Sequence, residues 1–212
     1  VALGAIDKKG NLSKPLGEQM ALMPLEPKYS KALLCSSKYE CAEEVLSIVS
    51  VISCDMGALF VSPRDKRREA AQARTSLIAP EGDLVTYLHV FAQYKKTGMT
   101  KNWCAKHYVS FRALRQAVKV RQQLKRLLSR LKIPISSCGE EYSYACKALL
   151  AGFFLNTARR QPNGEYRALS TGQEVRIHPS SVLCRSKPEC VIFNELVLTS
   201  QKYSAGGKNH LI

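Results

Sequence analysis

Several features that would point to an enzyme or a membrane protein are missing from these 212 residues. No apolar run approaches the roughly 18 residues that a membrane-spanning helix needs. The chain has no Gly-x-x-x-x-Gly-Lys-Ser/Thr phosphate loop, no Gly-x-Ser-x-Gly nucleophile motif and no His-Glu-x-x-His metalloprotease motif. Its four histidines have no catalytic companion pattern. We therefore expect no catalytic residue and no bound cofactor in this chain, and no membrane partner.

The eight cysteines include no Cys-x-x-C pair, the spacing that zinc sites and redox-active thiols commonly use. A chain of this length with 45% apolar residues can build its core without disulfide bonds. No signal peptide is visible, since residues 7–10 (Asp-Lys-Lys-Gly) interrupt the first apolar residues. We therefore expect free, mostly buried thiols of a reducing compartment and no metal site.

Acidic residues are absent from residues 84–139, which hold 12 lysines and arginines. The net charge of +15 comes mostly from this segment, because residues 1–83 are net neutral and residues 140–212 carry a net charge of +3. The segment is also rich in leucine, valine and aromatic residues, so it is a folded surface rather than a basic tail. Such an excess of positive charge favours a polyanionic partner.

The sharpest local signal is a long helix predicted over residues 108–131, which must end before Pro134. At about 100° per residue, five cations fall within an arc of about 60°. They are Arg112, Arg115, Lys119, Arg126 and Arg130, called here the cation stripe. Leucines and alanines occupy the opposite half, and no carboxylate stands four residues away to neutralise the stripe. We interpret the stripe as an anion-binding surface; the alternative is a solvated helix face.

Arg121 falls in the apolar half of the same helix. A cation there must either reach past the core to solvent or pair with a buried carboxylate. We predict that Asp83, at the end of the Pro-Glu-Gly-Asp turn of residues 80–83, is its partner.

The rest of the chain divides into a part with helical spacing and a part with short strand-like segments. Helical spacing is predicted over residues 16–21, 28–34, 38–52, 84–94 and 145–158, with a charged, exposed connection over 62–76. Short β-branched or aromatic-rich segments follow at residues 166–169, 175–178, 181–183, 191–193 and 196–199, separated by turns. A small barrel or sheet that follows a basic helical region suits single-strand binding.

Three ordered groups of motifs resemble the C-terminal region of DEAH-box RNA helicases. Residues 3–7 (Leu-Gly-Ala-Ile-Asp), 16–17, 20–21 and 24–27 resemble the end of the family's winged-helix domain. Residues 43–48, 80–83, 102–104 (Asn-Trp-Cys) and 120–124 (Val-Arg-Gln-Gln-Leu) resemble its helical ratchet domain. Residues 152–154, 177–183, 194–195, 199–200 and 203 resemble its OB-fold. The order and spacing match over residues 1–203.

This resemblance predicts an α+β multidomain chain: a helical ratchet bundle followed by a small OB-like β-barrel, with a winged-helix remnant at the N-terminus. The domains are expected at residues 1–27 (winged-helix remnant), 28–135 (ratchet) and 136–203 (OB-fold-like). Residues 204–212 look unrelated to the family and are expected as an atypical tail, so the barrel could lack its last strand and expose an edge. The chain also departs from the family at Leu84, where a His is usual, and at His107 and Tyr108, where Asn-Phe is usual.

The resemblance implies that the chain is the accessory region of an ATP-dependent RNA helicase. In this family two RecA-like domains carry the nucleotide motifs and bind ATP and Mg²⁺; those motifs are absent here, so this chain should bind single-stranded RNA without being an enzyme alone. The implied partners are the RecA-like domains of the same protein and a G-patch protein. The implied location is the nucleus, with residues 187–191 favouring the nucleolar, ribosome-biogenesis and general RNA-processing members.

RNA contacts are predicted in two groups. The ratchet contributes the cation stripe, and the OB-like part contributes His178, Ser180, Ser181, Thr199 and Lys202, with Tyr203 nearby. The alternative is a protein-interaction scaffold whose basic helix docks an acidic partner, with incidental RNA binding.

Overall fold

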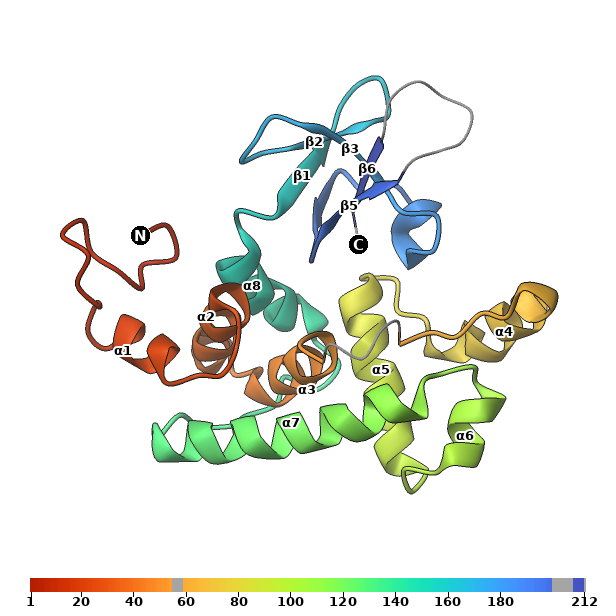
Figure 1. Ribbon diagram of the computed structural model, residues 1–212, viewed down its shortest axis with the longest axis horizontal. Helices are drawn as coiled ribbons and strands as arrows, with labels where there is room; N and C mark the ends of the chain where they lie inside the picture. Colours follow the sequence, from red (N-terminus) through yellow and green to blue (C-terminus); the bar gives the residue numbers. More distant parts are fainter. Residues whose placement is uncertain (55–58, 200–207, 212) are drawn as a thin grey trace.

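The computed structural model describes residues 1–54, 59–199 and 208–211, and it places a small β-sheet on one side of a layer of helices (Figure 1). The helices are α1 (Leu16–Ala21), α2 (Pro27–Cys35), α3 (Ala42–Ile52), α4 (Arg67–Arg74), α5 (Asp83–Lys96), α6 (Lys101–Lys106), α7 (Phe111–Arg130) and α8 (Tyr142–Phe153). The strands are β1 (Thr157–Arg160), β2 (Tyr166–Ala168), β3 (Glu174–Ile177), β4 (Cys190–Ile192), β5 (Leu196–Thr199) and β6 (Lys208–Leu211). The predicted α+β architecture of a helical bundle followed by a small sheet is confirmed.

Helix α7 begins three residues later than predicted, for a local reason. Tyr108 has a left-handed backbone (φ 53°), and Val109 pairs with Phe60 in an isolated β-bridge. The helix can start only after these residues, where the Ser110 hydroxyl accepts a hydrogen bond from the Ala113 amide at 3.2 Å. Residues 108–110 therefore belong to the loop that joins α6 to α7.

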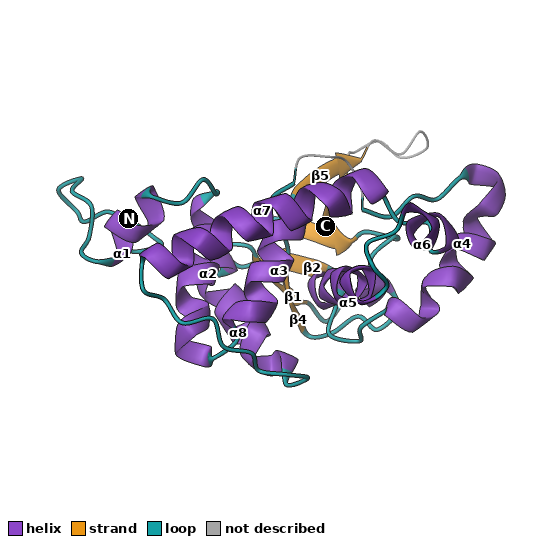
Figure 2. Ribbon diagram, turned by 90° about the horizontal axis from the view of Figure 1, so that it is seen from below, coloured by secondary structure: helices purple, strands orange, loops and turns teal. Residues whose placement is uncertain are grey.

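Helix α3 lies at the centre of the helical layer, as its all-round apolar sequence predicted. Val45, Leu46, Ile48 and Val49 are completely buried. Helix α7 packs along α3 with Leu124 and Leu128, while its first half packs on α5, and α2 packs tightly on α8. Figure 2, seen from below, shows α7 across the outer face of the layer, with the strands behind it.

Helices α2 and α8 approach so closely that only glycine fits at one crossing point. A Cβ added to Gly152 would lie 2.1 Å from the Lys28 carbonyl oxygen and 3.0 Å from the Ala32 Cβ. This contact explains why the sequence breaks a good helix with glycine there, since glycine costs roughly 0.5–1 kcal/mol relative to alanine in a helix.

The strands form one six-stranded sheet in the order β4-β1-β2-β3-β6-β5. Neighbours run antiparallel except β3 and β6, which run parallel. Ala158, Ala168, Val175, Val191 and Phe193 are buried on the inner face together with Tyr166. The sheet stands above α8 and the start of α5, on the side of the molecule opposite α7 (Figure 1).

Two expectations for the sheet region were wrong. The helix predicted over 145–158 ends at Phe153, and β1 begins at Thr157, because a turn in which the Asn156 amide bonds to the Phe153 carbonyl (2.7 Å) separates them. Residues 182–184 form a 3₁₀ helix rather than a strand, since the Ser181 side chain caps it.

The tail was also misjudged. Residues 208–211 form β6, which lies between β3 and β5, so part of the expected tail is a strand of the sheet. The described strands form an open sheet with β4 and β5 at its edges. Strand β6 lacks a recognisable strand pattern in sequence, and its partners in β3 lie 34 residues earlier. Sequence reasoning could not detect that long-range pairing.

No helix in the described ranges is both long enough and apolar enough to cross a membrane.

Candidate nucleic-acid interface

All five side chains of the cation stripe are exposed on α7, a helix about 30 Å long at 1.5 Å per residue. Within the part of the chain that the structure describes, none of the five forms an ion pair with a carboxylate. The opposite half of the helix is buried, with Leu114, Ala117, Leu124 and Leu128 at most 1% exposed. The segment therefore folds as the amphipathic spacing predicted, with one face packed and the other lined with cations.

The charge of α7 is unfavourable for the helix itself. Its first turn holds Arg112 and no acidic residue, whereas the positive end of a helix dipole favours negative charge. The neighbouring like charges at Arg115 and Lys119, and at Arg126 and Arg130, also repel each other at i, i+4 spacing. An anion along this face would relieve both effects. The electrostatics thus favour a bound polyanion over a solvated face.

Arg121 does not pair with Asp83, so that prediction was wrong. Its guanidinium bonds to the Glu43 carboxylate, and its Nε donates to the Ser47 hydroxyl at 3.0 Å. Helix α3 lies directly on α7 and presents both acceptors one turn apart, whereas Asp83 starts a different helix. The sequence feature that could have identified the partner of Arg121 is the pair Glu43 and Glu44 in the first turn of α3, the most apolar helix.

Asp83 faces the OB-like part instead. Its carboxylate accepts hydrogen bonds from the Ser181 hydroxyl and from the Val182 amide, the latter at 3.0 Å. Ser181, predicted to contact RNA, is half-buried and uses its hydroxyl hydrogen in this junction. It therefore joins the two parts of the chain.

The other predicted OB-side residues lie on the same loop, at the end of β5 or beyond the described residues. The exposed Ser180 bonds to His178 Nδ1 through its hydroxyl (2.6 Å) and its amide (3.2 Å), so Nδ1 is the acceptor in this pair. Thr199 is the last residue of β5, for which the backbone is described. Lys202 and Tyr203 lie outside the described residues.

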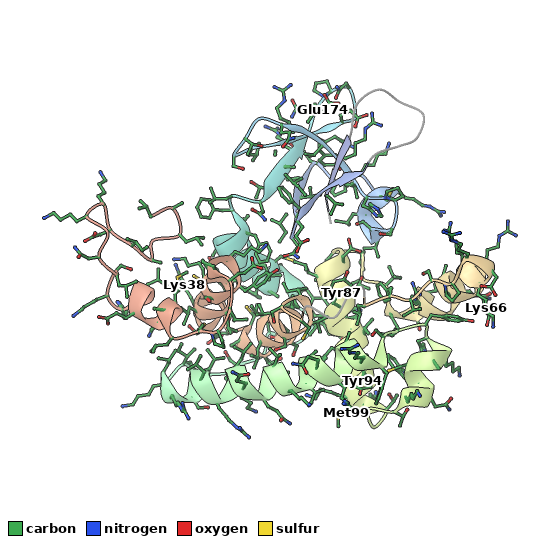
Figure 3. All side chains as sticks on the ribbon, in the orientation of Figure 1. Lys38, Lys66, Tyr87, Tyr94, Met99 and Glu174 are labelled. Carbon is green, nitrogen blue, oxygen red and sulfur yellow. The ribbon has the colours of Figure 1, made fainter. Side chains whose placement is uncertain are left out.

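The two predicted RNA-binding groups lie on different sides of the molecule. The buried face of α7 packs on α3 and α5, so the stripe faces away from the sheet, and the side chains along the outer edge of α7 project away from it (Figure 3). The loop of His178 and Ser180 lies with the sheet, on the opposite side of the helical layer. A strand that touched both groups would have to pass around the layer.

Sequence reasoning missed a basic surface on the sheet. Strand register places Arg159 opposite Arg167, both exposed on the outer face, with Glu174 next to Arg167. Arg159 bonds to Glu189 at 2.7 Å, and Arg167 has no carboxylate within ion-pair distance in the described residues. The alternation of buried alanine and exposed arginine would have revealed this surface, had residues 157–160 been read as a strand.

The eight cysteine thiols are free and differ in burial. No three His, Cys, Asp or Glu side chains gather to hold a metal within the described ranges, and all eight cysteines are free. Only Cys41 and Cys104 are fully buried and Cys190 is exposed, so "mostly buried" overstated their burial. Burial is the main cause that raises the pKa of Cys41 to about 12 and that of Cys104 to about 11, which keeps both thiols protonated.

Comparison with known proteins gives the same three parts in the same order. Residues 1–25 match the winged-helix model of the helicase-associated domain (HA2), residues 26–87 match its ratchet-like model, and residues 145–206 match an oligonucleotide/oligosaccharide-binding (OB)-fold model. Helix α7 lies between the second and third matched ranges.

Full-length relatives extend the match to 95% of the chain. The pre-mRNA-splicing factor ATP-dependent RNA helicase DEAH10 of Arabidopsis thaliana is 42% identical over 216 residues, and the chain covers 30% of it. The pre-mRNA-splicing factor ATP-dependent RNA helicase prp22 of Schizosaccharomyces pombe is 39% identical (17% of that protein covered), and the ATP-dependent RNA helicase DHX33 of Homo sapiens is 37% identical (28% covered). The chain thus spans less than a third of each of these relatives. The winged-helix, ratchet and OB-fold parts stand in this order, and these RNA helicases match 95% of the chain. The chain therefore corresponds to the C-terminal region of DEAH-box RNA helicases.

Proposed function

We propose that this chain holds single-stranded RNA as the accessory region of an ATP-dependent RNA helicase that unwinds RNA or remodels RNA–protein complexes. ATP and Mg²⁺ bind to RecA-like domains of the same protein, and the chain itself binds no cofactor and catalyses no reaction. The observation that carries the proposal is the cation stripe, in which five exposed cations, none paired with a carboxylate of the described residues, share one helix face. The OB-fold family match supports oligonucleotide binding by the sheet.

The stripe predicts how binding depends on salt. Each phosphate contact on a single strand contributes about −0.7 to the slope of log K against log salt, so five contacts give a slope of about −3.5. The exposed face of α7 carries no aromatic residue on which bases could stack, so binding there should show little base preference. The OB side adds His178 and Ser180, with Ser181 holding their loop in place, and Thr199 at the end of β5. Lys202, outside the described residues, is a further proposed contact.

The test compares two double charge reversals in the 212-residue chain. Arg115→Glu with Arg126→Glu changes the stripe, and Lys8→Glu with Lys9→Glu makes the same change of charge in an exposed turn near the N-terminus. We expect the stripe variant to lose at least tenfold in affinity for a single-stranded RNA at low salt and to show a shallower salt slope, whereas the control retains most binding. Equal losses in both variants would mean that the effect is general charge rather than this face.

The position of the stripe favours a second candidate function for that face. Because the stripe points away from the sheet, an acidic segment of another protein could occupy α7 while RNA binds on the OB side. This is the scaffold alternative, and arginine forks suit carboxylates as well as phosphates. If the stripe variant binds RNA like the wild type but loses a glutamate-rich peptide, the stripe belongs to a protein partner.

The remaining partners and the location follow from the relatives. Two of the three are named as pre-mRNA-splicing factors, which supports a nuclear location and a role in RNA processing for this chain. The RecA-like domains of the same helicase are its proposed intramolecular partners. A G-patch protein, the nucleolus and ribosome biogenesis stay predictions from the resemblance. Copurification of the full-length protein with splicing or with preribosomal RNA separates the two pathways.

A further inference from the structure

Among the described residues, two polar junctions connect the sheet to the helical layer. At the first, Asp83 at the start of α5 accepts bonds from Ser181 and Val182, which lie 98 and 99 residues later. At the second, Asn194 accepts from the Tyr29 hydroxyl (2.7 Å) and, through its carbonyl, from Lys28 Nζ (2.9 Å). The first junction holds the loop that follows β3, and the second holds the turn between β4 and β5.

Close packing reinforces the first junction. Gly82, which precedes Asp83, has φ 130°, and a Cβ added there would lie 3.2 Å from Leu183 Cδ1. Leu183 also packs against the buried core of the sheet. The segment of residues 181–183 is therefore fixed between α5 and the sheet, with Asp83 supplying its polar contacts.

The loop behind this segment is internally tied. The Ser181 amide bonds to the His178 carbonyl (2.9 Å), and the Ser181 hydroxyl oxygen accepts from the Leu183 amide (3.2 Å). Ser180 and His178 are bonded to each other through side chains. Residues 178–184 are thus a short unit, and a contact that holds Ser181 also determines where His178 and Ser180 lie.

We propose that Asp83 is a positioning residue, through which the ratchet part sets the place of the OB loop 178–184 for RNA. This inference rests on the proposed function, because it assigns RNA contacts to that loop. Asp83 itself is turned toward the loop backbone and needs no contact with RNA. The Asn194 junction holds the turn between β4 and β5, so it should not keep the loop 178–184 in place when Asp83 is removed.

The primary variant is Asp83→Ala, with Glu81→Ala as the matched control in the same turn. Glu81 is exposed, and no hydrogen bond or ion pair of its side chain occurs within the described residues. Asp83→Asn keeps one acceptor oxygen, so its exchange rate and RNA affinity should be intermediate. Ser181→Ala removes the hydroxyl that donates to Asp83 and keeps the charge at the start of α5. The last variant keeps the test valid if Asp83→Ala fails to fold.

Two measurements report on the proposal. Amide hydrogen exchange of residues 178–184 should accelerate about tenfold or more in Asp83→Ala, since a hydrogen bond to a charged group is lost together with a second one. The affinity for single-stranded RNA should fall about three- to tenfold, because only the fraction of molecules with a placed loop binds well. Glu81→Ala should change neither quantity.

A double-mutant cycle separates positioning from mere stability. If Asp83 acts through the loop, His178→Ala weakens RNA binding in the wild-type background but has a smaller effect in Asp83→Ala. Additive effects of the two substitutions, or wild-type affinity in Asp83→Ala while the wild type and Glu81→Ala bind RNA, would overturn the proposal. Absence of salt-dependent RNA binding by the wild type would instead overturn the proposed function, and the exchange rates would still show whether Asp83 holds the loop.

Discussion

Replacing Glu43 by alanine should destabilise the chain more than removal of any ordinary exposed carboxylate. The substitution leaves the Arg121 guanidinium, in a residue that is 8% exposed, with the Ser47 hydroxyl as its remaining side-chain partner. Breaking a buried ion pair by removing one partner costs roughly 3–5 kcal/mol. The Glu43 side chain is 37% exposed, so solvent already screens the pair and a cost of about 2–3 kcal/mol is expected.

The measurement is urea unfolding followed by far-ultraviolet circular dichroism, with Glu140→Ala as the control. Glu140 is an exposed loop carboxylate, and its removal should change the free energy of unfolding by less than about 0.5 kcal/mol. Arg121→Met should cost less than Glu43→Ala, because it leaves the carboxylate that can still reach water and preserves the packing of the side-chain stem. If Glu43→Ala and Glu140→Ala lie within about 0.5 kcal/mol of each other, the ion pair does not stabilise the α3–α7 contact and the reasoning is wrong.

Three further predictions follow from burial. Cys190 should react first with a thiol reagent at pH 8, and Cys41 last, since a pKa of about 12 leaves roughly one thiolate in ten thousand at that pH; equal rates in the native chain would contradict this. The free energy of unfolding should fall as the pH rises above 9. The Cys41 and Cys104 thiols ionise near their ordinary pKa in the unfolded chain but stay protonated in the fold until about pH 11–12. Unfolding midpoints measured at pH 8 and 10.5, with the Cys41→Ala variant as the control, test this direction. Gly152→Ala should cost about 1–3 kcal/mol because its Cβ would collide with the Lys28 carbonyl oxygen; Ser143→Ala on the exposed side of α8 is its control, and equal unfolding midpoints would refute the close approach.

Local patterns predicted the elements whose determinants are local. The apolar periodicity of α3 and α7, Pro27 at the start of α2 and the turn before α5 lie within a few residues of the structure they specify. The cation stripe belongs to this class, because helix geometry alone determines which residues share a face. Its exposure followed from the same periodicity, since the opposite half of α7 had to be buried.

Partners across the fold depended on tertiary structure. Arg121 needed a carboxylate, and the sequence offered several, but only the packing of α3 on α7 selected Glu43 over Asp83. Strand β6 was hidden because its pairing with β3 is long-range and its residues carry no local strand signal. The role of Ser181 was misassigned for the same reason, since its partner lies 98 residues earlier.

By itself, the sequence determined that this chain is a basic, mostly helical region with a small sheet and one helix lined by cations, because charge and periodicity are properties of neighbouring residues. Tertiary structure decided that the cation stripe and the loop 178–184 face opposite sides of the molecule. It also decided that Asp83 bonds to Ser181 and Val182 of that loop and not to Arg121 of α7. Those facts depend on how α7, α5 and the sheet pack against one another, and packing joins residues that no local pattern connects.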